Sequence, residues 1–140
     1  MRLTAGIALA AITLAACGAT STEAQLRADC AVIVADPEGK ETLMNMNADE
    51  ASFCACLNTN ILALGEAEQA KARATLTYVS VKATETGQGV EDVAGALMRD
   101  AMMSPDDAEI QAIVEGVPIV GEVFDKVEKD FDAGTCTRAG

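Results

Sequence analysis

Residues 48–64 read ADEASFCACLNTNILAL, and this stretch decides the fold because it has the character of a helix that carries two cysteines. Residues 47–50 provide capping side chains at its start, and Gly65 ends it. Residues two apart on a helix point about 200° away from each other, so Cys54 and Cys56 cannot bond to one another without breaking the helix. Each is therefore expected to bond to a cysteine elsewhere in the chain.

The expected partners are Cys30 and Cys136, which stand alone near the two ends of the chain. One of them should bond to Cys54 and the other to Cys56, and the spacing does not decide which. The cysteine helix would then be fixed to an N-terminal helix on one side and to the C-terminal end on the other. By the chain-entropy model, each disulfide contributes about 3–4.5 kcal/mol.

The rest of the chain predicts helices in the same way, from apolar residues at helical spacing and from capping patterns. Asp36 to Gly39 reads as a turn, with a brief helical turn from Glu41 to Met46. The fold expected for residues 22–140 is a single all-α domain, a small bundle of about five or six short helices stapled by two disulfides. Besides the cysteine helix, the main predicted helical ranges are 22–36, 67–84, 90–103, 104–116 and 118–134.

Three details of these helices are specific enough to be tested. In the helix predicted at 67–84, packing is assigned to Ala70, Ala74 and Val81, and the alternation from residue 75 to residue 81 keeps a strand as the alternative. Ser104 is expected to cap the next-to-last helix. Met44-Asn45-Met46, and Met98 with Met102-Met103, resemble the soft-ligand clusters of periplasmic copper binders, because thioethers favour Cu(I). Met98 and Met102, four residues apart, are nevertheless expected to fill the core.

The N-terminus differs from the rest. After Arg2, residues 3–16 read LTAGIALAAITLAA and carry no charge. Fourteen residues are fewer than the roughly 20 needed to span a bilayer, but they suit the apolar core of a secretory signal. This segment has two simple interpretations: an ordinary signal peptide, in which Cys17 is incidental, or an apolar helix that is not cleaved.

Leu14-Ala15-Ala16-Cys17, followed by the small residues Gly18 and Ala19, resembles the lipobox of bacterial lipoproteins. The resemblance implies that residues 1–16 are a signal peptide that is removed, that the Cys17 sulfur receives a diacylglyceryl group, and that the new amine is acylated, commonly with palmitate. It also implies anchoring in a membrane of the cell envelope, facing the periplasm, with residues 17–21 as a short tether. Gly18 resembles the pattern that favours the outer over the inner membrane.

With Cys17 assigned to lipid, four of the five cysteines remain, an even number that suits two disulfides in an oxidising compartment. Two alternatives use the same residues. Cys54-Ala55-Cys56 could exchange disulfides, but it lacks the Cys-x-x-Cys spacing of thioredoxin-like motifs. A four-cysteine metal site would need paired ligands on both sides, so no metal site is predicted. Asp130 to Gly134 lacks the third acidic position of a calcium loop.

Composition excludes some classes of function. The chain has 22 acidic and 10 basic residues, a formal charge of −12, which argues against a nucleic-acid partner. It contains no histidine, the usual general base and metal ligand, and no catalytic constellation stands out. We therefore expect no enzymatic activity and no cofactor. The expected function is a structural or protein-interaction module with an envelope protein as partner. The alternatives are a periplasmic binder of an apolar molecule or Cu(I), and a thiol–disulfide redox protein.

Overall fold

The computed structural model describes residues 21–136. The predicted signal peptide, the lipidation site Cys17 and nearly all of the predicted tether lie outside the described residues. Within residues 21–136 the structure is entirely helical, which confirms the all-α prediction. The helices are α1 (Thr22–Ala35), α2 (Pro37–Asn45), α3 (Glu50–Leu62), α4 (Glu66–Thr86), α5 (Val90–Met103), α6 (Ala108–Val114) and α7 (Val117–Asp132).

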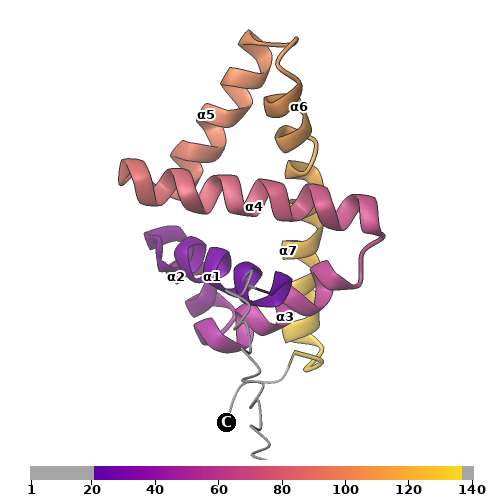
Figure 1. Cartoon of the computed structure of the whole chain (residues 1–140). Helices are drawn as coiled ribbons and strands as arrows, with labels where there is room; N and C mark the ends of the chain where they lie inside the picture. The colour runs from indigo at the N-terminus through magenta and orange to yellow at the C-terminus, as the bar shows by residue number, and fades with distance from the viewer. Residues whose placement is uncertain (1–20, 137–140) are drawn as a thin grey trace, which may run out of the picture.

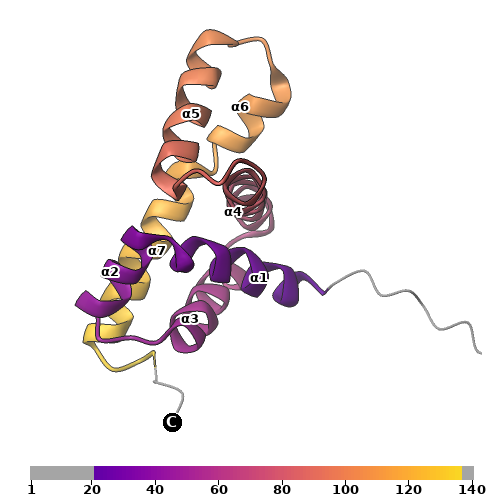
Figure 2. The ribbon, with the colours of Figure 1, turned by 90° about the vertical axis from the view of Figure 1, so that its left-hand side faces the viewer.

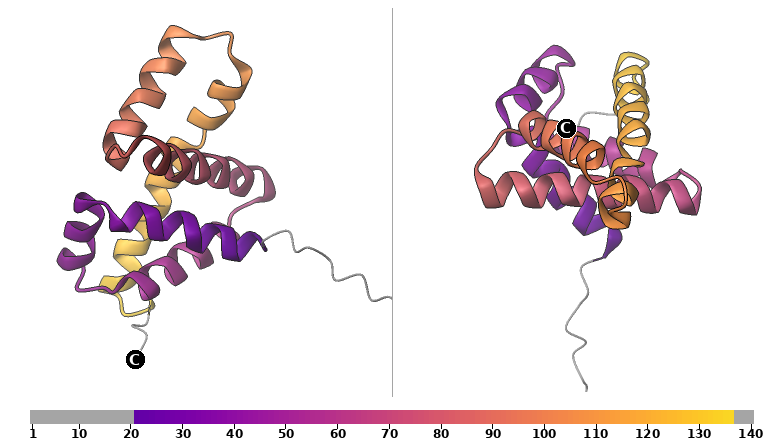
Figure 3. Two further views of the ribbon diagram at one scale, coloured as in Figure 1. Left: turned by 60° about the vertical axis from the view of Figure 1, so that its left-hand side comes forward. Right: turned by 90° about the horizontal axis from the view of Figure 1, so that it is seen from above.

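The helices form a body and a projecting hairpin. The long helix α4 crosses over α1, and α7 runs past α4 to lie beside α3 (Figure 1). The pair α5–α6 contacts α4 from the other side and extends away from α1 and α3 (Figure 2). The same order, with α1 and α3 below α4 and the hairpin above it, is visible from a further direction (Figure 3).

The main core surrounds α3. Phe53 is almost fully buried, and its ring centroid lies 5.7 Å from that of Phe124 and 6.4 Å from that of Phe131, both on α7. Leu57 and Ile61 continue the buried face of α3. Three aromatic rings therefore join α3 to α7 in a chain that is otherwise poor in aromatic residues.

A second join, between α1 and α4, is polar. Asp29 on α1 is buried, and its carboxylate accepts hydrogen bonds from Thr77 (2.6 Å) and Ser80 (2.6 Å) on α4. Gln25, one turn earlier on α1, donates a third at 3.0 Å. Burying a carboxylate is unfavourable unless its oxygens are hydrogen-bonded, and these three donors meet that requirement.

The helix boundaries correct one predicted turn and one predicted cap. The turn expected at Asp36–Gly39 is instead the start of α2, because Asp36 accepts from the Glu38 amide and Pro37 stands at the first helical position. The predicted cap Ser104 is wrong. Ser104 closes α5, and Asp107 caps α6 by accepting from the amides of Glu109 and Ile110. The described part of the chain thus holds seven helices rather than five or six.

Two predicted packing faces are wrong as well. On α4, Ala70 and Ala74 are exposed and Val81 is 43% exposed, while the buried side chains are those of Ala72, Thr75, Leu76, Val79, Ser80 and Ala83. Spacing alone allows either face of this alanine-rich helix, and contact with α1 and α7 selects the one that is buried. The helical state of this segment, rather than the strand alternative, is confirmed.

Met98 and Met102 do not fill the core. Their exposed fractions are 45% and 74%, and the neighbouring Met103 is 81% exposed. The buried face of α5 is formed by Val93, Leu97 and Ala101, and these residues leave the methionines on the solvent side.

None of the described helices is long and apolar enough to span a bilayer.

Candidate functional site

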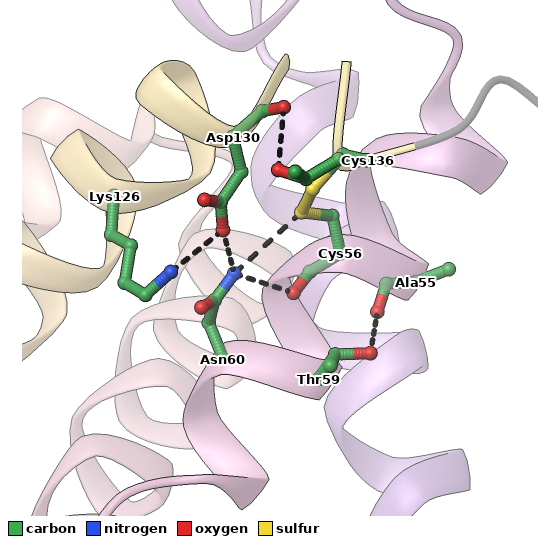
Figure 4. Close-up of a disulfide and its surroundings, with 8 residues drawn as sticks. Ala55, Cys56, Thr59, Asn60, Lys126, Asp130 and Cys136 are labelled. Carbon is green, nitrogen blue, oxygen red and sulfur yellow. Dashed lines mark hydrogen bonds and ion pairs between the residues drawn. A yellow bond between two sulfur atoms is a disulfide. The ribbon is translucent and has the colours of Figure 1, made fainter. Parts of the chain in front are cut away.

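The candidate site is a surface cavity of about 420 Å³ beside the disulfide that joins α3 to the C-terminal end. Its walls come from α3, from the last two turns of α7 and from the residues that follow α7 (Figure 4). It is lined by Ser52, Ala55, Cys56, Thr59, Asn60, Lys126, Asp130, Thr135 and Cys136.

The structure contains both disulfides that the cysteine count predicted. Cys30 bonds to Cys54 and Cys56 bonds to Cys136, so the pairing left open by the sequence is resolved. The first bond fixes α1 to α3. The second fixes α3 to the residues just beyond α7, and α3 is therefore held on both sides.

The two disulfides differ in their surroundings. Cys30 is fully buried and Cys54 is 5% exposed, and both belong to the main core. Cys56 is 7% exposed and also belongs to the main core, whereas Cys136 is only partly buried and packs against that core; both line the cavity. The two bonds therefore differ at one residue, because Cys136 is only partly buried, whereas the other three cysteines are buried in the core.

Asn60 organises the polar side of the cavity. It lies one turn after Cys56 on α3, and its side-chain amide donates to the Cys56 carbonyl oxygen (3.1 Å) and to the Asp130 carboxylate (3.1 Å). The same nitrogen lies 3.6 Å from the Cys56 sulfur, within reach of a weak N–H···S hydrogen bond (Figure 4). One buried amide thus links the helix backbone, the disulfide and α7.

Asp130 places a charged group close to the sulfurs, with a carboxylate oxygen within 4.8 Å of both. The hydrogen bond from Lys126, at 2.9 Å, and then the one from Asn60 hold the pKa of this carboxyl below its usual range. Its backbone carbonyl accepts from the amides of Thr135 (2.8 Å) and Cys136 (3.1 Å), which brings the chain back over the end of α7. The backbone of Asp130 therefore holds residues 135 and 136 against the end of α7, while its carboxylate lies beside the disulfide.

A metal ion would need thiolates here, and the disulfide does not provide them. Within residues 21–136, three atoms that could bind a metal lie within 4.8 Å of one another: the sulfurs of Cys56 and Cys136 and a carboxylate oxygen of Asp130. In the bonded state the two sulfurs are joined to each other, and zinc binds cysteine as the thiolate. The oxidised cavity therefore offers a single carboxylate, and that carboxylate is already paired with Lys126.

A different kind of surface lies at the end of the α5–α6 hairpin. Met98, Met102 and Met103 are exposed on the last two turns of α5, next to the exposed turn at residues 104–107. The same end of the hairpin carries the exposed acidic side chains of Asp100, Asp106, Asp107 and Glu109. We call these three methionines and four acids the methionine end.

An apolar cavity of about 130 Å³ lies where α4, α5 and α7 meet α1, lined by apolar side chains and Thr75. Ligand pockets for small molecules are commonly about 300–1,000 Å³, so this cavity is too small for a lipid chain or a molecule of similar size. It gives little support to the apolar-ligand alternative.

Sequence spacing predicts the disulfide cysteines, of which Cys56 and Cys136 line this cavity, but it does not point to Asn60 or Asp130 as parts of the site. The position of Asn60, four residues after Cys56, was a usable signal because it places both on one face of a helix. In the sequence, Asp130 stands out only as part of a segment with a weak likeness to a calcium loop, and the structure places residues 130–132 in α7. No protein-family model, no curated protein sequence and no solved structure matches this chain.

Proposed function

We propose that this chain is a non-enzymatic lipoprotein of the bacterial cell envelope that binds a protein partner through the methionine end of its α5–α6 hairpin. The observation that carries the proposal is the exposure of Met98, Met102 and Met103, which are 45%, 74% and 81% accessible at the end of a projecting element. Methionine is flexible and polarisable and is favoured at surfaces that adapt to a partner.

The position of the methionine end supports a protein rather than the anchoring membrane as its partner. Only residues 18–21 separate Cys17 from the start of α1, so a lipid on Cys17 would hold α1 close to the bilayer. The hairpin extends to the far side of α4 from α1 and α3 (Figures 1 and 2). The methionines are thus presented away from the first helix of the domain.

The charge around the methionines supports a particular chemistry in that partner. Asp100, Asp106, Asp107 and Glu109 are exposed beside them, and Arg99 is the one basic side chain between residues 90 and 116. Complementary charges steer association and disfavour wrong partners. The proposed partner surface therefore has an apolar centre with lysine or arginine around it, which an anionic bilayer surface does not offer.

Site-specific photocrosslinking tests this proposal. A photoreactive phenylalanine analogue at Met102 should give one discrete protein adduct in membranes of cells expressing the full chain. The same analogue at Met44, which is 72% exposed on α2, is the matched control and should give none. The adduct from Met102, once identified, should bind the purified chain in a salt-dependent manner.

Charge substitutions complete the test. Met102→Glu should weaken binding of the identified partner by about tenfold or more, because it places a charge in an apolar contact. Met44→Glu should leave binding unchanged. Equal adducts from positions 44 and 102, or capture of anionic vesicles by the methionine end, would contradict the proposal.

The anchor is tested separately. Cys17→Ser should move the chain from the membrane fraction to the soluble fraction, because a single residue provides the site of lipid attachment. Mass spectrometry of the mature N-terminal peptide should show an acylated diacylglyceryl-cysteine. A chain that remains membrane-bound after Cys17→Ser would contradict the lipoprotein assignment without affecting the partner-binding proposal.

Copper binding is the second candidate, favoured by the same three exposed thioethers. Thioether sulfur is a soft ligand that prefers Cu(I). Titration of the full chain with Cu(I) against a colorimetric chelator distinguishes the two proposals. A partner-binding surface predicts no competition with the chelator, whereas a copper site predicts competition that is lost when Met98 and Met102 are replaced by leucine.

A further inference from the structure

The Cys56–Cys136 disulfide has the environment of a reactive bond rather than of an enclosed one. It borders a cavity of about 420 Å³, and one of its two cysteines is only partly buried. Cys30, Cys54 and Cys56 are 0%, 5% and 7% exposed within the main core, so Cys136 is the accessible end of this bond. Exchange requires an attacking thiolate to reach a sulfur, so the accessibility of Cys136 distinguishes this bond from Cys30–Cys54.

We infer that Cys56–Cys136 is a site of thiol–disulfide exchange for small dithiols and exposed cysteine thiolates, in which Cys136 is attacked and Cys56 leaves. Cys136 is the more accessible of the two. The side-chain amide of Asn60 lies 3.6 Å from the Cys56 sulfur, where an N–H donor stabilises the negative charge that develops on a leaving sulfur. Access and hydrogen bonding thus assign the same roles.

The reaction balances as a two-electron exchange. The attacking thiolate forms a bond to the Cys136 sulfur, the bond between Cys136 and Cys56 breaks, and its electron pair stays on Cys56 as a thiolate. The second thiolate of a dithiol then attacks the reagent sulfur of the mixed disulfide, which releases Cys136 as a thiolate. The dithiol is oxidised to its cyclic disulfide, and the protons lost by its thiols pass through the solvent to the cysteine thiolates.

Asp130 moderates this reaction. Its carboxylate oxygen lies within 4.8 Å of both sulfurs, and its charge opposes an approaching thiolate. The Lys126 ammonium, 2.9 Å from the carboxylate, offsets part of that charge. Asp130→Asn keeps the shape of the side chain and removes the charge, so it should speed reduction about two- to fivefold at low ionic strength.

Reduction of the full-length chain tests the inference. Cys17→Ser is present in every sample so that the remaining four cysteines are the paired ones. The oxidised protein is treated with increasing dithiothreitol without denaturant, alkylated and mapped by mass spectrometry. Cys56 and Cys136 should become alkylated at a concentration about tenfold or more below that needed for Cys30 and Cys54.

The direction of attack is read from mixed disulfides. After brief exposure to glutathione and an acid quench, the glutathione adduct should lie on Cys136. An adduct mainly on Cys56, no adduct at all, or simultaneous reduction of both pairs would overturn the inference.

Asn60→Ala tests the role of the amide as a positioning group. It should slow attack at Cys136 about three- to tenfold and shift the adduct towards Cys56, because it removes the donor to that sulfur. A purely structural role would instead speed exchange at both sulfurs by loosening the site. The matched control is Asn58→Ala, a buried asparagine of the same helix that donates to the Glu23 carbonyl oxygen and should leave the adduct on Cys136.

Discussion

Thr75 on α4 donates a hydrogen bond of 2.6 Å to the backbone carbonyl oxygen of Ile113 at the end of α6. Thr75 is buried, and the same hydroxyl lies 3.1 Å from the Lys71 carbonyl oxygen of its own helix. This side chain therefore links the base of the α5–α6 hairpin to the body of the molecule, beside the exposed Lys71–Glu115 ion pair at 2.7 Å.

The first prediction concerns this attachment. Thr75→Val preserves the branched shape but removes the donor, so the free energy of unfolding should fall by about 1 kcal/mol. Urea denaturation with the disulfides intact measures the change. Thr59→Val is the matched control, because the Thr59 hydroxyl is exposed and bonds only within its own helix, and its effect should be close to zero. Equal effects of the two substitutions would contradict the assigned role of Thr75.

The second prediction concerns Gly116, which lies between α6 and α7. A Cβ atom there would overlap the Thr75 hydroxyl and the Lys71 carbonyl group, so α4 and this junction are in contact only because residue 116 has no side chain. Gly116→Ala should destabilise the fold by about 1–3 kcal/mol. Gly121→Ala, within α7 and facing open space, should instead stabilise it by about 0.5–1 kcal/mol. Thermal denaturation of both variants provides the comparison.

The third prediction concerns the buried carboxylate between α1 and α4. Asp29→Ala leaves the hydroxyls of Thr77 and Ser80 without their acceptor, so stability should fall by about 2–3 kcal/mol. Asp125→Ala, at an exposed position of α7, should change stability by less than about 0.5 kcal/mol. A similar loss at both positions in chemical denaturation would argue against a specific role for the Asp29 cluster.

The fourth prediction concerns pH. Partial removal from water, then a hydrogen bond to Glu91 and the charges of Glu91, Asp36 and Asp92, raise the pKa of Glu38. A raised folded-state pKa means that the folded chain binds this proton more tightly than the unfolded chain. The stability that the folded state gains from the proton on Glu38 is therefore complete below the ordinary pKa of glutamate, and it is lost as pH rises through the raised pKa.

Glu38→Gln should accordingly raise the melting temperature at pH 7 and have no effect at pH 3, where Glu38 is protonated in both states. Differential scanning calorimetry at several pH values measures the difference between the variant and the parent chain. Glu122→Gln, an exposed position of α7, is the control and should show no such gain at pH 7. A Glu38→Gln gain that is independent of pH would point to a cause other than the ionisation of Glu38.

The central helix and the presence of two disulfides could be predicted because both follow from local facts. Two cysteines two residues apart on a helix face different neighbours, and this holds wherever those neighbours lie. Which neighbour is which could not be predicted. The choice depends on α1 lying against the Cys54 side of α3 and the C-terminal end lying against the Cys56 side, an arrangement set by packing across the whole chain.

The candidate site could not be predicted for the same reason, because it too depends on how distant helices pack. Asn60 and Asp130 are 70 residues apart and meet only because α7 packs against α3. The exposed methionines of α5 are a second example of a feature that depends on packing. Met98 and Met102 share a helix face, but periodicity does not say whether another element covers that face, and here the covered residues are Val93, Leu97 and Ala101.

The arrangement of the two disulfides along the chain also determines what a protease could achieve. Cutting any peptide bond between residues 56 and 136 leaves two pieces joined through Cys56–Cys136, and a cut between residues 30 and 54 leaves them joined through Cys30–Cys54. Within residues 30–136, only the two bonds flanking Ala55 escape this rule, and they lie inside α3. A molecule nicked in the exposed turn at residues 104–107 would therefore migrate as a single species until it is reduced.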